Sequence, residues 1–577
     1  MAHCRYSDDL PHEKSLAYLP SSVTLAGLIY STVWLVLLAP IAGGGASAET
    51  GSAACAVCHA SIFAEYMRTP MALSSGRTGT GRFAESFERG EFSPARSGIR
   101  YRVYQDGKKP SFAFDLTDNG LRIQDSRSLE YFVGSGTVGR SYLYSMGRFL
   151  YQAPVAYYTA NQKWEMSPGY QNYGRLNLTR PVQPVCLRCH ASGLQPTQGT
   201  LNGFADPAFL EGGIGCERCH GPGEEHISKT TTGAIEGGLG IVNPRKLSGE
   251  RRDSVCAQCH LTGIARIGKF GRDSGSFRAG ALLSDYMTVF AWSGAPAEMK
   301  VTSHVEKLAE SRCKIESGDR LWCGSCHNPH SRPTSDQKAS YFRNKCLGCH
   351  SGAVSCTASA QLRASSDNRC VDCHMPKTPV INVAHAVYTD HSIPRRAGAP
   401  VVREPVSAGR VLIPFGNGKA SDRDLGLAYG VVIEGERNPI YEARAFELLT
   451  TSVAQQPNDI PALVQLAHLY SNRGEPDQAI ALYERVLRAD PTQVVAAANL
   501  ATHLMKKGRA SEAIRLWSDA LARSPGLEIA RLNFALALHF TGDAQAAEQA
   551  LMEGLKLNPG ANEMRRLLNQ IRQPIPP

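Results

Sequence analysis

Apolar and polar side chains alternate along residues 99–114, a stretch that reads IRYRVYQDGKKPSFAF. Alternation of this kind places one set of side chains on each face of a β-strand. The pair Asp106–Gly107 lies between two such runs and is typical of a tight hairpin turn. Residues 129–136 and 148–159 have the same character. We therefore expect a small antiparallel β insert within residues 76–180.

The C-terminal part, residues 423–572, repeats with a period of 34 residues. Prolines, glycines and alanines recur at this spacing: Pro457, Pro491, Pro525 and Pro559; Gly474, Gly508 and Gly542; Ala467, Ala501 and Ala535; Ala479, Ala513 and Ala547. Small residues let two helices pack closely, and the prolines end the second helix. The pattern resembles the tetratricopeptide repeat, whose arrays form a concave surface for proteins or peptides. We expect three clear repeats and a weaker one at 424–457, serving for docking or as a structural cap.

Residues 181–392 contain few apolar runs, and their connections are short and glycine-rich. A segment of this kind cannot build an ordinary apolar core, and its regular structure is expected to be sparse and mainly helical. Residues 393–422 are rich in proline and glycine without periodicity, which predicts a linker. The chemistry of residues 181–392 therefore has to be sought in their cysteines.

The sequence Cys-x-x-Cys-His occurs seven times and uses 14 of the 17 cysteines. One motif lies in a first segment, residues 49–75, and six lie within residues 181–392. Two thiols at this spacing can bond both vinyl groups of one haem, and the adjacent histidine then lies under the iron. The pattern predicts seven covalently attached haems c. Motifs 1 to 7, in chain order, are Cys55, Cys58 and His59; Cys186, Cys189 and His190; Cys216, Cys219 and His220; Cys256, Cys259 and His260; Cys323, Cys326 and His327; Cys346, Cys349 and His350; Cys370, Cys373 and His374.

Two other uses of paired cysteines fit the sequence less well. Structural zinc sites take four ligands from paired knuckles at fixed separation, whereas these motifs are irregularly spaced and each has its own histidine. A thioredoxin-like redox pair would be a single motif in a βαβ context. Both alternatives are therefore set aside.

The second axial ligand of each iron must come from outside the motifs. Five further histidines lie in or just after the motif-rich region: His226, His304, His330, His385 and His391. His330 follows His327 by three residues and cannot wrap around the same porphyrin, so it should reach a neighbouring haem; the same holds for His226 after His220. Met71 is a candidate ligand for another iron, with ordinary packing as the alternative. The three histidines of the repeats, His468, His503 and His539, are expected on the surface. At least one haem is left five-coordinate.

The N-terminal segment, residues 1–48, has an apolar run at 23–42 followed by Ala46–Ser47–Ala48, a small-residue cleavage site. This indicates a secretory signal peptide, and an uncleaved membrane anchor is the alternative. Either way the remaining chain is expected to be periplasmic or otherwise exported. Of the remaining cysteines, Cys313 and Cys356 are then expected to form a disulfide in an oxidising compartment.

The net charge of +10 raises the question of a nucleic-acid partner. The propionates of seven haems explain the excess of lysine and arginine better, so no nucleic-acid partner is predicted.

The motifs in CERCHGPGEEH, CGSCHNPH and CVDCHMPK resemble those of multihaem cytochromes c of the cytochrome c-554 type. The resemblance covers roughly residues 50–395. It implies closely packed haem pairs, mostly with two histidine ligands, and it makes His226, His304, His330, His385 and His391 the distal ligands. Seven motifs exceed the four of that family's core, and the β insert lies outside it. The expected fold is mainly α with sparse secondary structure: a multihaem cytochrome c domain with a small antiparallel β insert, then an α–α superhelix of tetratricopeptide repeats.

Two functions fit this architecture. The first is an electron carrier that works between redox partner proteins, one of them docked on the repeats. The second is a multihaem oxidoreductase that acts on nitrite, hydroxylamine or tetrathionate at a five-coordinate haem. The C-x-x-C-K motif of pentahaem nitrite reductases is absent.

Overall fold

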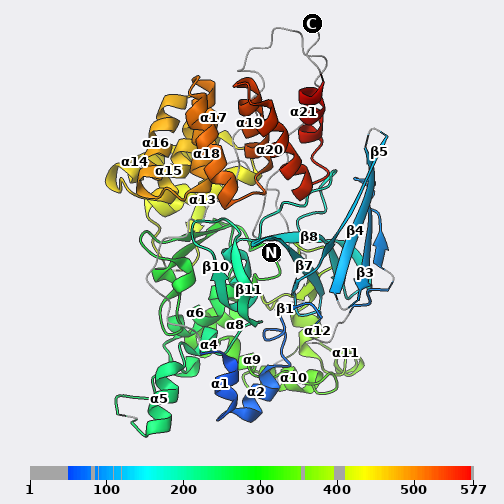
Figure 1. The fold of residues 1–577 in the computed structure, drawn as a ribbon. Helices are drawn as coiled ribbons and strands as arrows, with labels where there is room; N and C mark the ends of the chain where they lie inside the picture. The colour runs from blue at the N-terminus through cyan, green and yellow to red at the C-terminus, as the bar shows by residue number, and fades with distance from the viewer. Residues whose placement is uncertain are drawn as a thin grey trace.

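The computed structural model describes residues 50–79, 85–88, 90–107, 109–118, 120–234, 236–351, 356, 358–395, 410–416 and 418–573. The expected signal peptide at 1–48 lies outside these residues. In the part of the chain that is described, no helix is both long and apolar enough to cross a membrane. The repeat helices form one end of the molecule, and the motif-bearing helices form the other (Figure 1).

The expected β insert consists of two antiparallel sheets. One contains β2 (Gly90–Phe92), β3 (Arg100–Asp106), β4 (Lys109–Asp118) and β5 (Leu121–Ser128). The other contains β1 (Ser75–Arg77), β6 (Tyr131–Val133), β7 (Gly139–Met146), β8 (Phe149–Tyr158) and β9 (Lys163–Met166). Their alternating side chains meet in one apolar cluster that includes Phe112, Phe114 and Tyr142. The hairpin turn is where the sequence predicts it, because Asp106 pairs with Lys109 and Gly107 has a φ of +57°.

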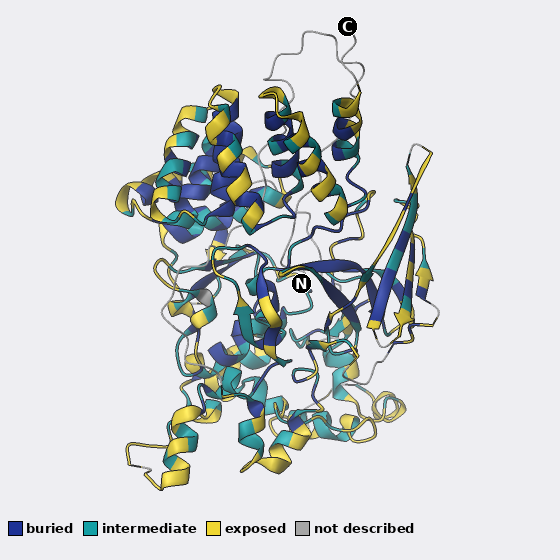
Figure 2. Ribbon diagram, in the orientation of Figure 1, coloured by how far each residue is buried: buried dark blue, intermediate teal, exposed yellow. Residues whose placement is uncertain are grey.

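The motif-bearing region is built mainly of short helices. They are α1 (Ser52–Ala56), α2 (Ala60–Tyr66), α3 (Pro184–Leu187), α4 (Glu217–His220), α5 (Glu224–Thr232), α6 (Gly249–His260), α7 (His304–Ala309), α8 (Arg312–Ser317), α9 (Cys323–Cys326), α10 (Lys338–Leu347), α11 (Ala360–Ser365) and α12 (Cys370–His374). Helices α8 to α12 contain no buried residue, and Figure 2 shows this end as mostly intermediate or exposed. The polypeptide alone therefore builds little core here.

Three small antiparallel sheets accompany these helices. Strands β10 (Ala191–Pro196) and β11 (Phe204–Gly212) form one, and β14 (Lys377–Pro379) and β15 (Val387–Thr389) form another. The third joins β12 (Ala265–Gly268), β13 (Met287–Trp292) and β16 (Leu412–Pro414). Strand β16 lies in the segment for which the sequence predicts a linker. The linker expectation is wrong for these residues, because Leu412 pairs with Trp292 and the strand completes a sheet of the motif-bearing region.

The C-terminal helices form four antiparallel pairs and a last single helix. They are α13 (Asp422–Gly435), α14 (Pro439–Gln455), α15 (Ile460–Asn472), α16 (Pro476–Ala489), α17 (Val494–Lys506), α18 (Ala510–Arg523), α19 (Glu528–Phe540), α20 (Ala544–Leu557) and α21 (Asn562–Arg572). The recurring alanines are fully buried where paired helices meet, among them Ala467, Ala501 and Ala535. Each second helix ends two residues before its predicted proline. The three clear repeats and the weaker fourth are thus confirmed.

The repeat histidines differ from the expectation that they lie on the surface. His468 is only 8% exposed and His503 only 6%, because α15 and α17 pack against helices of neighbouring repeats. His503 Nε2 is 2.7 Å from the Ser471 hydroxyl, and the Asn472 amide donates to His468 Nε2 at 3.1 Å. These histidines are polar members of the repeat core.

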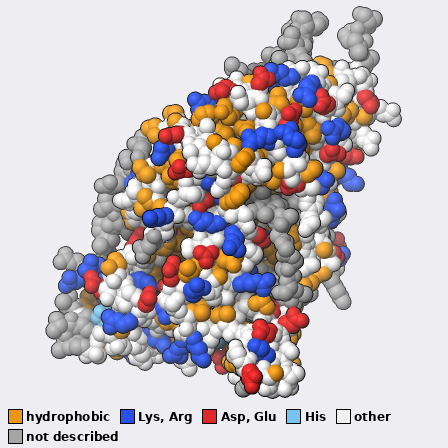
Figure 3. Space-filling view, turned by 90° about the vertical axis from the view of Figure 1, so that its left-hand side faces the viewer, with side chains coloured by type: hydrophobic (Ala, Val, Ile, Leu, Met, Phe, Trp, Pro, Cys, Tyr) orange, Lys and Arg blue, Asp and Glu red, His pale blue; other side chains and the backbone are white. Residues whose placement is uncertain are grey.

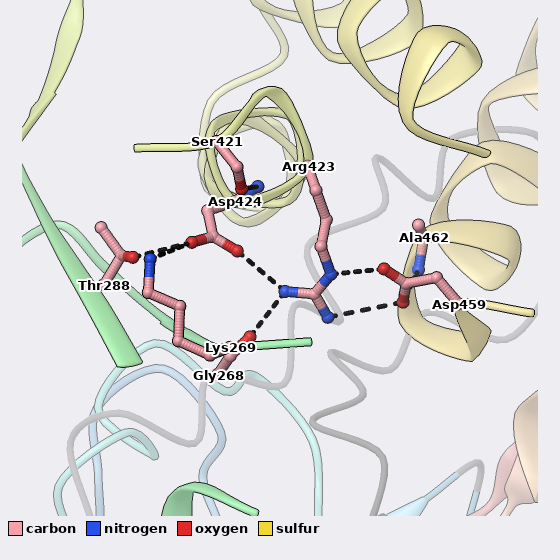
Figure 4. Close-up of polar contacts among 8 residues, drawn as sticks. All are labelled: Gly268, Lys269, Thr288, Ser421, Arg423, Asp424, Asp459 and Ala462. Atoms are coloured by element: carbon pink, nitrogen blue, oxygen red, sulfur yellow. Dashed lines mark hydrogen bonds and ion pairs between the residues drawn. The ribbon is translucent and has the colours of Figure 1, made fainter. Parts of the chain in front are cut away.

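The repeat array is joined to the motif-bearing region by a buried polar cluster (Figure 4). The Asp424 carboxylate accepts hydrogen bonds from Lys269 Nζ and the Thr288 hydroxyl, both at 2.8 Å. Arg423 donates to the Gly268 carbonyl at 2.6 Å and forms an ion pair with Asp459. The side chains of Asp424 and Asp459 have no exposed surface. Gly268 ends β12, Lys269 lies in the turn that follows it, and Thr288 belongs to β13. The cluster therefore fixes α13 against that sheet.

Replacing Asp424 with alanine should destabilise the array by about 3–5 kcal/mol, because Lys269 and Arg423 would lose a buried counter-ion. Asp422→Ala is the matched control, since Asp422 is exposed on the same helical turn. Urea unfolding followed by helical circular dichroism measures both. Equal losses for the two variants would contradict a special role for the buried cluster.

The repeats should also lose stability in mild acid. Burial lowers the pKa of His468 and of His503 to about 4, so both are neutral in the folded array. The unfolded chain takes up these protons below its ordinary histidine pKa of about 6.5, and stability should fall between about pH 6.5 and pH 4. Thermal unfolding of the helical signal across this range tests the prediction. A His468→Gln, His503→Gln variant with an unchanged acid slope would refute it.

Candidate haem-binding site

All seven motifs lie on or at the end of a short helical turn. In four of them the histidine N–H donates to the carbonyl of the first cysteine: His59 to Cys55, His220 to Cys216, His327 to Cys323 and His350 to Cys346, at 2.9–3.0 Å. This i to i−4 bond places the first cysteine and the histidine on one face of the turn. Among the described residues, no three His, Cys, Asp or Glu side chains converge as ligands of a single bare ion would. Each motif thus presents its own imidazole; both cysteines are free thiols in motifs 1 and 3 to 7, whereas in motif 2 Cys189 is free and Cys186 is disulfide-bonded.

A cavity of about 1420 Å³ lies at the centre of the motif-bearing region. A pocket for one small molecule has roughly 300–1,000 Å³, so this cavity is larger than such a pocket requires. The β insert supplies part of its wall through Tyr157 and Tyr158. Five motifs line it, through Cys186, Cys189, His190, Cys219, Cys256, Cys259, His260, Cys323, Cys326, His327 and Cys346.

Basic side chains line the same cavity, among them Arg188, Arg218, Arg266, Lys338 and Lys345. Cations of this kind suit the carboxylates of porphyrin propionates. On the face of the molecule in Figure 3, by contrast, lysine and arginine side chains are interspersed with aspartate and glutamate.

Three motif histidines face a second imidazole. The ring centroids of His59 and His226 are 6.4 Å apart, those of His220 and His330 5.8 Å, and those of His327 and His391 6.2 Å. The interplanar angles are 15°, 10° and 31°. Two imidazoles on opposite faces of one metal ion, with bonds of roughly 2 Å, have centroids about 6 Å apart. These three pairs have the spacing of axial ligand pairs.

His304 lies between two other histidines. Its ring centroid is 5.0 Å from that of His260 and 5.0 Å from that of His391, with interplanar angles of 87° and 76°. The Nδ1 atoms of His260 and His304 are 3.4 Å apart. A metal ion between His260 and His304 would require these rings to separate by about 1 Å. The residues at motifs 4 and 5 therefore form a continuous row of imidazoles: His260, His304, His391 and His327.

Backbone carbonyls fix the orientation of several of these rings. Nδ1 lies 2.8–2.9 Å from a carbonyl oxygen in His220, His226, His374 and His391, whose partners are Val242, Leu239, Pro394 and Thr389. A protonated Nδ1 that donates to a carbonyl leaves Nε2 free as the basic nitrogen, which is the usual second-shell arrangement for a metal-bound histidine. The sequence carries no signal for these partners, because any residue supplies a carbonyl. The donor set and the cavity together fit haem.

Burial keeps three histidines of this region neutral. It lowers the pKa of His190 to about 3, that of His327 to about 4 and that of His304 to about 2. Metal ions bind the neutral form of histidine. These rings are therefore in the form that a metal requires at neutral pH.

The remaining expected ligands are not paired in this way. None of the ring contacts among the described residues joins His190, His350 or His374 to a second imidazole. His385 instead places Nε2 2.7 Å from the Glu165 carboxylate and its ring against Tyr158. Met71 lines the central cavity.

Thiols of different motifs are in direct contact. Cys55 is hydrogen-bonded to Cys216, and burial together with this neighbour raises the pKa of Cys55 to about 11. The Cys259 thiol donates to the Cys189 sulfur and lowers the pKa of Cys189 to about 6. Cys256 likewise donates to Cys323 and lowers its pKa. Cys346 is hydrogen-bonded to Cys370. The attachment points of motifs 1 and 3, 2 and 4, 4 and 5, and 6 and 7 are thus neighbours.

The expected disulfide between Cys313 and Cys356 is not present, since both are free thiols in the structure. Cys313 lies close enough to Cys326 and Cys346 to raise their pKa values, whereas Cys356 is exposed. The two cysteines that remain outside the motifs and outside the expected signal segment are therefore not paired with each other.

Comparison with known proteins finds a family match in each of the two parts of the chain. Residues 155–221 match the family described as cytochrome c554 and c-prime. Residues 443–504 and 504–571 match the tetratricopeptide repeat family. A curated relative, the multiheme cytochrome MtrA of Shewanella baltica (strain OS185), is 26% identical over 180 residues. This match covers 29% of the chain and 51% of the relative, so the chain spans about half the length of that protein.

Solved structures with similar helices are matched at low scores. MamA from Desulfovibrio magneticus RS-1 is 18% identical with a TM-score of 0.24, over 27% of this chain and 85% of that one. The first tetratricopeptide domain of Spaghetti (RPAP3), bound to an HSP90 peptide, is 22% identical with a TM-score of 0.19, over 19% of this chain and 89% of that one. The assignment of the repeats rests on the family match and on the 34-residue period instead. The chain therefore joins a multihaem cytochrome c domain of the cytochrome c554 type, which binds haem c covalently, to a C-terminal array of tetratricopeptide repeats.

Proposed function

We propose that the protein is a seven-haem c-type cytochrome that passes electrons between redox partner proteins outside the cytoplasm. Site 1 to site 7 denote the positions of motifs 1 to 7. When bound, haem c supplies a reversible one-electron couple at each iron. The thiols of each motif would hold the group covalently, and the motif histidine would bind its iron.

The observation that carries this proposal is that side-chain contacts link all seven sites. Thiol contacts relate sites 1 and 3, 2 and 4, 4 and 5, and 6 and 7. Sites 3 and 4 are linked by the Gln258 amide, which donates to the Arg218 carbonyl at 3.0 Å. Sites 5 and 6 are linked by His327 and Phe342, a residue of α10, whose ring centroids are 5.6 Å apart. The resulting order runs 1–3–4–5–6–7, with site 2 beside site 4.

Ligand exchange between segments supports the same proposal. His226 follows motif 3 but faces His59 of motif 1, and His330 follows motif 5 but faces His220 of motif 3. A ligand shared in this manner ties each site to its neighbour through a few residues of chain. Short separations between sites are what rapid electron transfer along a series of haems needs.

The repeat array would dock a protein or peptide, consistent with the family it belongs to. The turns between repeats already contact the cytochrome domain: Glu528 accepts from Thr179, and Arg523 donates to the Gly199 carbonyl. A partner would therefore be held in fixed relation to the haem sites. The apolar segment 23–42 and Ala46–Ser47–Ala48 support export to the periplasm.

The alternative is a small-molecule oxidoreductase. It is favoured by one observation: the rings of His190, His350 and His374 face no second imidazole within the described part of the chain. A five-coordinate haem at one of these sites could bind nitrite, hydroxylamine or tetrathionate. A high-spin ferric signal that shifts on adding nitrite or hydroxylamine would support this function over simple electron transfer.

The haem count tests the central claim. The mature protein should carry seven covalent haems by mass spectrometry, and the Cys323→Ala, Cys326→Ala variant should carry six. Cys313→Ala is the matched control and should retain seven, because Cys313 lies near site 5 without belonging to a motif. A mature chain without covalent haem, or a motif 5 variant with the wild-type mass increment, would refute the proposal.

The ligand pairing is tested by replacing a single distal histidine. His330→Ala should convert one low-spin haem to a high-spin form in the EPR spectrum, because His220 would lose its opposite imidazole. His385→Ala should leave the spectrum unchanged, since His385 contacts Glu165 rather than a motif histidine. Unchanged low-spin signals in the His330 variant would contradict this assignment, and a new high-spin signal in the His385 variant would assign that residue to an iron.

A further inference from the structure

We propose that Glu306 is a positioning residue that fixes the segment carrying His304 against the segment carrying His260. The inference rests on the proposed function and assigns these two histidines to one iron at site 4, to which their rings, now 5.0 Å apart, would open by about 1 Å. Site 4 contacts sites 2, 3 and 5, so its geometry affects every route through the chain of sites.

Glu306 joins the two segments directly. His304 is the first residue of α7, and Glu306 lies two residues later in the same helix. Its Oε1 atom accepts hydrogen bonds from the backbone N–H groups of Thr262 and Gly263, both at 2.6 Å. These two residues come two and three positions after His260. One carboxylate oxygen therefore connects α7, which carries His304, to the backbone that follows His260.

The burial of Glu306 argues that this contact is specific. The residue is only 3% exposed, and an ionised carboxylate is costly to remove from water unless hydrogen bonds replace its hydration. Two backbone N–H groups provide such bonds to its Oε1 atom. By contrast, Glu310 at the end of the same helix accepts from Ala297 and Lys307 and does not contact the segment after His260.

Two further contacts join the same segments. Lys300 Nζ donates to the Gly263 carbonyl at 2.9 Å, and the hydroxyls of Thr262 and Thr302 are hydrogen-bonded. The residues before and after His304 are thus both attached to the stretch that follows His260. With both backbones held, His304 has little freedom to move away from the opposite face of site 4. Removing Glu306 should loosen the joint and let His304 leave the iron.

The test compares holoproteins with Glu306→Ala, Glu306→Asp and Glu306→Gln. In the alanine variant the reduced protein should bind carbon monoxide at one more haem per chain than the wild type, and a new high-spin ferric EPR signal should appear. The aspartate variant should behave similarly, because its carboxylate is shorter by about 1.5 Å. The glutamine variant should stay close to the wild type, since its amide oxygen can accept both N–H groups. Glu316→Ala, which removes an exposed carboxylate on α8, is the matched control.

The outcomes distinguish a failure of the positioning role of Glu306 from a failure of the proposed function. If the alanine and aspartate variants retain the wild-type carbon monoxide stoichiometry and EPR spectrum, the positioning role is refuted while the proposed function stands. If the alanine variant fails to mature, the aspartate and glutamine variants decide: a wild-type spectrum in both refutes the role. If His304→Ala itself leaves the wild-type spectrum unchanged, the assignment of His304 to site 4 fails.

Discussion

The arrangement of the motif-bearing region depends on how each Cys-x-x-Cys-His turn presents its cysteines and an imidazole toward one group. Helices α8 to α12 bury nothing of their own, and the central cavity of the region is lined by five of the motifs. Apolar burial, the usual source of folding energy, must then come from a group that the thiols hold in place. The sparse secondary structure and the chemistry of this half of the molecule both follow from the Cys-x-x-Cys-His turns.

The two ends of the molecule are stabilised in different ways. The repeat array has a continuous apolar core that runs through successive helix pairs. The motif-bearing end has short helices around a cavity. The sheet β12–β13–β16 and the ion cluster around Arg423 and Asp424 connect the two. The repeat array, which has its own apolar core, is thus attached to the motif-bearing end, which has little. Each part can therefore hold the other in position.

Features encoded by local spacing could be predicted from the sequence. The hairpin at Asp106–Gly107 and the 34-residue repeat depend on residues near one another in the chain, and the structure has both. Contacts between distant residues could not be predicted. Nothing in the sequence indicates that β16 pairs with β13, or that the Val242 and Leu239 carbonyls orient two histidines. Nor does the sequence show that His468 and His503 are buried. Their burial depends on helices of neighbouring repeats, which cover faces of α15 and α17 that the sequence pattern alone would leave exposed.

The pairing of β13 with β16 has a consequence for the order in which the protein is completed. Motifs 5, 6 and 7 all lie between these two strands in the sequence. A chain that leaves the cytoplasm N-terminus first exposes β13 before these motifs and β16 only after them. The edge of β13 that pairs with β16 then stays unpaired until the segment with these three motifs has also emerged. Closure of this long loop, with its entropic cost, would then be a late step of folding, and the repeats, which follow β16 in the chain, would be seated only after it.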